Sequence, residues 1–241
     1  MELRTAIALC TALASASSLA QAQTPSSATE LGPTRGFSQE WGQTASYSKV
    51  SADLQTGAYD TGGGIRLGID NSELIINSDL ISEDTNEAIF KLGMGSFQAG
   101  SFTVDWAPTV GIALQDTDDV DTKNFMVGAA FTGRAQDLIL NLQPAIARLD
   151  VENDNTGADY SDTVLQLGLG AYYVLPETRF GRFMPGVEFT LIEGDDYDED
   201  ILNIGVRWVY NPRVVLDLVV IHRSDYDVSG LPGIARLNVA F

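Results

Sequence analysis

The sequence is poor in the residues on which metal sites and disulfides depend. It has one cysteine, Cys10, and one histidine, His222, among 241 residues. So few sulfur and imidazole groups cannot build a zinc cluster or a disulfide framework. Basic residues are also scarce, because 14 Lys and Arg face 33 Asp and Glu, which gives a net charge of −19. Nucleic acid is therefore excluded as a partner, since phosphate backbones are bound by clustered basic side chains. No later run of roughly 18 apolar residues predicts a membrane helix.

The N-terminus has the features of a secretory signal peptide over residues 1–22. Arg4 supplies a positive charge, an apolar run spans residues 6–13, and Ala20-Gln21-Ala22 fits the small-x-small cleavage rule. Cleavage after Ala22 would remove Cys10 and leave a mature chain without cysteine. Residues 23–43 are rich in Pro, Ser and Gly and lack a period, which predicts a flexible periplasmic lead-in.

From about Thr44 to Phe241 the hydrophobic period is two, which indicates β-strands. The clearest segment is 102–114, where large apolar residues alternate with small or polar ones. The same pattern recurs at 125–132, 165–173, 202–210 and 237–241. The apolar face is wide and continuous, whereas the other face has too little bulk to form a core. This polarity favours a membrane barrel, which is apolar outside and polar inside, over a soluble sandwich.

Counting the alternating runs predicts twelve strands, with ten as the alternative count because the first three are the weakest. The expected strands are 44–54, 63–70, 74–82, 88–97, 102–115, 124–134, 138–150, 163–175, 183–193, 201–210, 214–223 and 233–241. An even number suits a bacterial barrel whose two ends lie on the same side.

The connections between these strands alternate in length and charge. Tight turns are expected near residues 71–72, 98–100, 135–136, 176–181 and 211–212. Longer acidic loops are expected on the opposite side, such as 116–121, 152–162 and 193–200. Short periplasmic turns and longer outer loops are typical of outer-membrane barrels. Aromatic residues gather toward the tight-turn end of their strands, as expected for rings at headgroup depth.

The last eleven residues, LPGIARLNVAF, form an alternating strand that ends in Phe241. This strand resembles the C-terminal signal of Gram-negative outer-membrane β-barrels, and residues 44–241 as a whole resemble such a barrel with porin-like architecture. The resemblance implies an all-β, antiparallel, up-and-down transmembrane barrel in the bacterial outer membrane. It also implies contact with outer-membrane lipids and recognition of the last strand by the barrel assembly machinery.

The inner face of this barrel is expected to carry charges of both signs. The residues expected to line the lumen are Arg66, Lys91, Asp105, Arg134, Glu188, Arg207, Asp217 and Arg236. A three-residue turn at 211–213 would put Arg207 opposite Asp217. A water-filled lumen lined in this way predicts a passive channel for small polar solutes. The alternative is a closed structural or surface-interaction barrel, filled by charges that pair across the interior.

One pair of residues carries an enzymatic hypothesis. His222-Arg223-Ser224 resembles the His-x-Ser of outer-membrane lipid hydrolases of the phospholipase A and lipid A deacylase types. If Leu218 and Val220 face lipid, strict alternation puts His222 on the same face. Arg236 falls near the position where those enzymes carry an amide or acid, and Asn238 is the alternative candidate for the third member of the site. No cofactor is expected. The acidic loops lack EF-hand spacing, and no metal site is expected.

Overall fold

The computed structural model describes residues 35–44, 50–57, 61–79, 85–116, 120–153, 158–195, 197–223 and 233–241. Within these ranges no helix is long and apolar enough to cross a membrane. The strands are β1 (Val50–Gly57), β2 (Gly62–Ile69), β3 (Ser72–Asp79), β4 (Thr85–Leu92), β5 (Ser96–Ala99), β6 (Phe102–Asp116), β7 (Val120–Ala135), β8 (Leu138–Asn153), β9 (Ala158–Tyr173), β10 (Arg182–Glu193), β11 (Asp198–Asn211), β12 (Val214–Arg223) and β13 (Ile234–Ala240).

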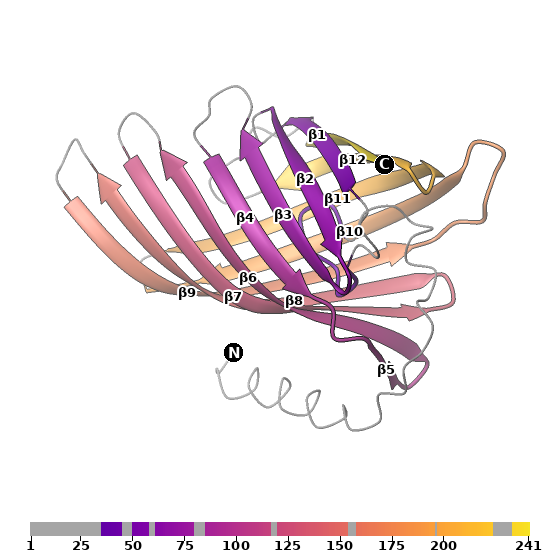
Figure 1. Cartoon of the computed structure of the whole chain (residues 1–241), viewed down its shortest axis with the longest axis horizontal. Coiled ribbons are helices and arrows are strands. Elements are labelled where there is room, and N and C mark those ends of the chain that lie inside the picture. Colours follow the sequence, from indigo (N-terminus) through magenta and orange to yellow (C-terminus); the bar gives the residue numbers. More distant parts are fainter. Residues whose placement is uncertain are drawn as a thin grey trace.

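These strands form a closed antiparallel barrel (Figure 1). Each strand pairs with its neighbours along the chain, and β1 pairs with β13 from Ser51↔Ala240 to Gly57↔Ile234. β4 and β5 do not pair with each other; instead β4 pairs with β6. The short β5 pairs with the same strand β6, beyond the end of β4. The wall therefore has twelve strand positions, and the predicted twelve-strand, all-β barrel is confirmed.

The expected fourth strand, 88–97, is interrupted in the structure. The chain leaves regular pairing at Gly93–Gly95, and Gly95 has a φ of 86°, which side chains disfavour. The Met94 amide still donates to the Trp106 carbonyl over 3.0 Å. β4 and β5 are thus two parts of one wall strand joined by a bulge, which alternation alone does not reveal.

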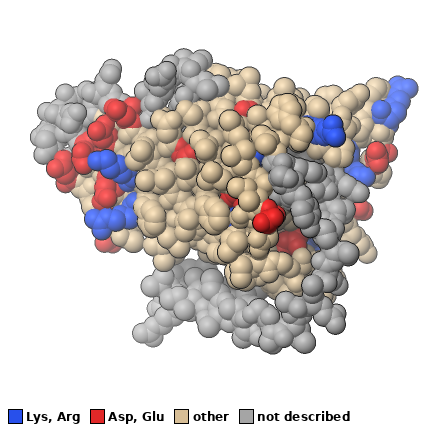
Figure 2. Space-filling view, viewed as in Figure 1, with Lys and Arg blue, Asp and Glu red and all other residues tan. Residues whose placement is uncertain are grey.

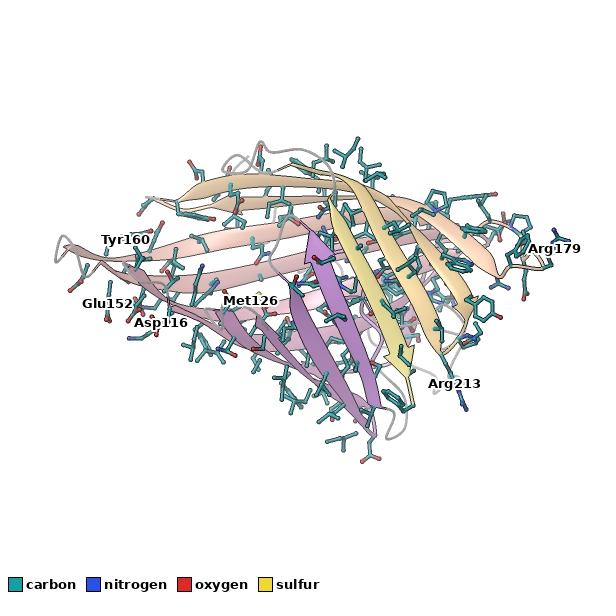
Figure 3. The ribbon with its side chains drawn as sticks, turned by 90° about the horizontal axis from the view of Figure 1, so that it is seen from above. Asp116, Met126, Glu152, Tyr160, Arg179 and Arg213 are labelled. Atoms are coloured by element: carbon teal, nitrogen blue, oxygen red, sulfur yellow. The ribbon has the colours of Figure 1, made fainter. Side chains whose placement is uncertain are left out.

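The tight turns and the longer connections lie at opposite ends of the barrel. Arg179 and Arg213 mark the tight-turn end in Figure 3, whereas Asp116, Glu152 and Tyr160 mark the other. Two turns close through a non-glycine residue with a φ of 53°, at Asp70 and Gln136. The first and last strands meet at the tight-turn end, where the Phe241 amide donates to the Val50 carbonyl over 2.9 Å.

The two faces of the wall have inverted polarity relative to a soluble protein. In β2, Ile65 is 47% exposed on the outside, whereas its neighbour Arg66 is 1% exposed inside. The same contrast separates Phe90 from Lys91 in β4. On the face seen in Figure 2, charged side chains gather toward the two ends, and the surface between them is mostly uncharged. The apolar face predicted from the alternation is thus the outer one.

Strand boundaries differ from the expected ones mainly where alternation is weak or irregular. β1 is described from Val50 onward, and Thr44, the expected first residue, is not in a strand; residues 45–49 lie outside the described ranges. In β12 the pairing with β11 shifts between Ile204↔Ile221 and Gly205↔Val219, which leaves Val220 as an extra residue. Val220 and Ile221 are consequently both exposed, at 53% and 45%. The strict alternation through β12 is therefore wrong beyond Val219.

Candidate functional site in the barrel interior

Residues 35–44, called here the inner segment, run through the inside of the barrel. Arg35, Phe37, Glu40 and Trp41 are all buried, with at most 8% of each exposed. The segment folds back on itself, because Arg35 and Glu40 form an isolated antiparallel bridge. Residues 35–43 are therefore part of the barrel interior and differ from the flexible periplasmic lead-in that the composition predicts. Residues 1–34, including the expected signal peptide, lie outside the described residues.

Glu188 of β10 holds the first half of the inner segment. Its carboxylate accepts hydrogen bonds from the Phe37 amide over 2.6 Å and from the Ser38 amide over 2.7 Å. The Ser38 hydroxyl and the Tyr172 hydroxyl also donate to this carboxylate. One wall side chain thus replaces the backbone partners that a strand or helix would have supplied.

The rest of the segment backbone is bound in the same way by other wall residues. The Glu40 amide donates to Gln143 over 2.9 Å, and the Gly42 amide donates to Thr132 over 2.7 Å. In the opposite sense, Arg236 donates to the Phe37 carbonyl over 2.6 Å. These contacts come from β7, β8 and β13, so the segment is fastened around the circumference of the barrel.

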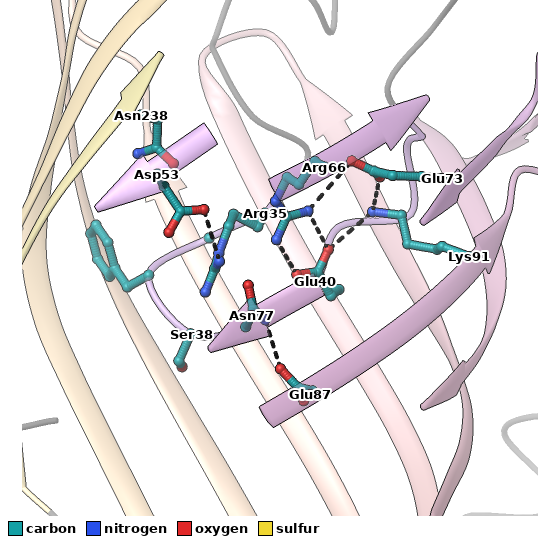
Figure 4. A network of polar contacts seen from close by, with 12 residues as sticks. Arg35, Ser38, Glu40, Asp53, Arg66, Glu73, Asn77, Glu87, Lys91 and Asn238 are labelled. Carbon is teal, nitrogen blue, oxygen red and sulfur yellow. Dashed lines mark hydrogen bonds and ion pairs between the residues drawn. The ribbon is translucent and has the colours of Figure 1, made fainter. Parts of the chain in front are cut away.

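A buried charge network joins the segment to β2, β3 and β4 (Figure 4). Arg66 donates two hydrogen bonds to the Glu40 carboxylate, of 2.9 Å and 2.5 Å, and Lys91 donates a third of 3.1 Å. Glu73 completes the network, 2.9 Å from Lys91 and 3.5 Å from Arg66. Burial alone would raise the pKa of Glu40, but the charges of Arg66 and Lys91 outweigh it and hold this pKa well below 4.5.

On the other side of the lumen the segment inserts two aromatic rings into an apolar cluster. Phe37 and Trp41 each meet Tyr172 edge to face, with ring centroids 5.5 Å apart. Around them lie buried side chains of β8–β13, among them Ile139, Met184, Val209, Val215, Val219 and Ile234. Apolar burial therefore adds to the polar contacts that hold the segment.

All eight residues expected to line the lumen lie on the inner face. Arg66, Lys91, Asp105, Glu188, Arg207, Asp217 and Arg236 are at most 8% exposed. Arg207 pairs with Asp217 across β11 and β12, with nitrogen–oxygen distances of 2.6 Å and 3.0 Å. Asp105 accepts a 2.5 Å hydrogen bond from Gln43 of the segment. Arg134 lies over the Trp41 ring, 5.7 Å from its centroid.

Sequence reasoning missed the residues that fill the lumen, above all Glu40 and Trp41. The available signal was local: residues 35–43 carry two charges and two aromatic rings within a stretch otherwise typical of a linker. Glu73 and Tyr172 were also missed. They lie on the inner face of β3 and β9 and contact residues that were expected there.

The described residues include only part of the proposed hydrolase site. The backbone of His222 pairs with that of Asn203, two residues beyond the bulge at Val220, so the alternation that put His222 on the lipid face does not hold. Ser224 lies outside the described residues. Among the residues that are described, no group of three or more His, Cys, Asp or Glu is placed to hold a metal ion.

The chain was compared with family models, curated proteins and solved structures. No family model matches the sequence, and no curated protein matches it. A solved structure of the NanC porin, in a rhombohedral crystal form, is 14% identical to this chain with a TM-score of 0.49. The match covers 80% of this chain and 98% of that one. The twelve-strand ring is established by this chain's own strand pairing.

Proposed function

We propose that this protein is a bacterial outer-membrane β-barrel that gives small polar solutes a passive path, and that the inner segment closes this path. The observation that carries the proposal is the inverted polarity of the wall. A barrel with exposed apolar residues outside and buried charges inside is stable only if lipid covers its outer face.

Two features of the outer face other than its hydropathy also support a membrane location. Aromatic rings pack together near the tight-turn end, where Trp208 stacks on Phe183 with centroids 6.2 Å apart. Rings of this kind prefer the depth of lipid headgroups. An apolar groove of about 600 Å³ crosses the outside of β6–β10, lined among others by Phe102, Phe131 and Leu169. Such a groove suits lipid acyl chains.

The interior supports a path for solutes, because the inner segment that fills the lumen is not part of the wall. The inner segment contributes no strand to the ring, and noncovalent contacts attach it to the barrel. If it leaves, the wall remains closed while Arg66, Glu188 and Arg236 face an opened space. Charged walls of this kind pass small polar solutes and select among them by charge.

Contacts beyond the barrel follow from the same proposal. Lipids of the outer membrane would surround the wall. The barrel assembly machinery would recognise β13, the strand that closes the ring against β1 and is followed by Phe241.

A reversible crosslink tests whether the segment closes a path. Asn203 of β11 donates to the Ser38 hydroxyl over 3.0 Å, and the chain without residues 1–22 has no cysteine of its own. We expect the Ser38→Cys/Asn203→Cys variant, refolded and inserted into planar bilayers, to carry no current when oxidised and to show current steps after reduction. Each single cysteine variant is the control and should not respond to reductant.

A closed structural barrel is the second candidate, favoured by the number of wall strands that hold the segment. Silence of the folded barrel in both redox states would support this candidate and contradict the channel. Equal currents in both states, with the crosslink verified, would show that the segment is not the closing element.

A further inference from the structure

Glu40 is bound inside the barrel in the way that a free carboxylate would be. Arg66 approaches it as a fork, through both terminal nitrogens, and Lys91 adds a third donor. This geometry suits a carboxylate, because the two parallel N–H groups of a guanidinium match its two oxygens. The carboxylate itself belongs to the inner segment and not to the wall.

The charges of the wall residues are unbalanced when Glu40 is left out. With Glu40 present, Arg66 and Lys91 face two carboxylates, those of Glu40 and Glu73. Without Glu40, these two buried cations would lose one of the carboxylates that face them. Loss of that negative charge beside Arg66 and Lys91, which are at most 1% exposed, favours the binding of another anion.

The site also has a donor that Glu40 does not use. Nε of Arg66 is buried and finds no hydrogen-bond partner among the described residues. A buried donor without a partner is costly, and a ligand with a further oxygen could satisfy it. The same arginine can therefore bind more oxygen atoms than the segment provides.

We infer that Arg66 and Lys91 form a binding site for the carboxylate group of a small organic anion, which Glu40 occupies while the inner segment is docked. The inference rests on the proposed function, because a solute reaches this site only if the segment can be displaced. An anion that binds here competes with Glu40 and so favours release of the segment. The tethered Glu40 acts at a high effective concentration, so the wild-type chain should bind such an anion only weakly.

Chemical rescue tests the site directly. Glu40→Ala removes the atoms of an acetate ion, leaving a space of matching shape beside Arg66 and Lys91. We expect the variant to melt at a lower temperature than the wild type, and 100 mM acetate to raise its Tm by about 3 °C. Acetamide has the same shape without the charge, and at equal ionic strength it should not restore the Tm.

Two control variants separate this site from general effects of the ion. Glu152→Ala breaks the exposed pair with Lys123, where both side chains are more than half exposed, and acetate should leave its Tm unchanged. In Glu40→Ala/Lys91→Met one of the two cations that would bind the anion is gone as well, so acetate should no longer stabilise. If acetate fails to stabilise folded Glu40→Ala, or if acetamide acts equally well, the inference is wrong.

A second measurement uses the wild-type chain and does not depend on the folding of a variant. Trypsin cleaves after Arg35, which is 8% exposed while the segment is docked. At a concentration high enough to saturate this weak binding, succinate should displace Glu40 and speed the cleavage at least about threefold, whereas succinamide at the same concentration should not. An unchanged rate would contradict the inference. Neither readout is a current, so failure of the carboxylate site remains distinguishable from failure of the channel.

Discussion

The guanidinium carbon of Arg207 lies 5.1 Å from the ring centroid of Trp41, so a charged wall residue is stacked on the inner segment. The same arginine is paired with Asp217 of the neighbouring strand. Trp41 thus connects the polar wall to the apolar cluster around Tyr172. This contact makes Trp41 the residue on which docking of the segment should depend most.

Replacing Trp41 with alanine should release the inner segment while leaving the barrel wall intact. Loss of a fully buried tryptophan costs about 3–5 kcal/mol, which corresponds to a more than 100-fold rise in the undocked population. Cleavage by trypsin after Arg35, identified by mass spectrometry, should accelerate accordingly. Trp106→Ala is the matched control, because Trp106 stacks on Phe131 on the outer face and should not change this rate. Equal rates in the two variants would refute the anchoring role.

A side chain at Gly42 should prevent docking by steric overlap. A Cβ there would meet the backbone carbonyl groups of Asp105 and Ala130, which the wall cannot move aside. We expect Gly42→Val to keep the circular dichroism of the barrel, to be cleaved quickly after Arg35, and to conduct in planar bilayers. Gly111→Ala is the control, since the atoms nearest to its Cβ would be in the side chains of Ile89 and Met126 at 3.3 Å, with the Ala88 carbonyl oxygen at an ordinary contact distance of 3.6 Å. A protected, silent Gly42→Val variant would show that the segment tolerates the change.

The buried pair of Arg207 and Asp217 should be costly to break on one side only. Arg207→Met leaves the Asp217 carboxylate with a 3.3 Å hydrogen bond from Asn238 and with Arg236 at 3.8 Å. We expect a loss of about 3–5 kcal/mol in the free energy of unfolding, measured by urea denaturation of the refolded barrel. Arg207→Met/Asp217→Leu should recover part of it, because the Asp217 charge is no longer buried without Arg207, although Arg236 loses its carboxylate neighbour. A double variant as unstable as the single one would argue that the pair itself stabilises the wall.

The wall of the barrel could be predicted from the sequence, because the alternation within each strand shows which residues face outward and which face the lumen. Ile65 and Arg66 are neighbours in the chain and face the outside and the lumen, so the period of two is visible locally. The tight turns followed from the same pattern, since alternation stops where the strands end. The eight lumen residues were expected from strand parity alone.

The inner segment could not be predicted in this way, because distant residues determine its conformation. Phe37 is bound by Glu188, 151 positions further along the chain. No local period marks such a segment, since the wall supplies its hydrogen-bond partners. The bulge at Val220 is similar in kind, because it becomes visible only in the pairing of β12 with β11. The enzymatic hypothesis depended on that alternation and lost its geometric basis there.

Acidic pH should weaken the docked state through Glu40. Arg66 and Lys91 lower the pKa of Glu40 in the docked state, whereas the group titrates near its ordinary 4.5 when the segment is free. The stabilisation from Glu40 is therefore complete above pH 4.5 and is lost progressively as the pH falls toward the lowered pKa. Urea denaturation at a series of pH values between 6 and 3 should show that the free energy of unfolding falls more steeply for the wild type than for Glu40→Gln, which lacks this titration. Parallel pH profiles for the two proteins would mean that the Glu40 carboxylate is not held by the two cations.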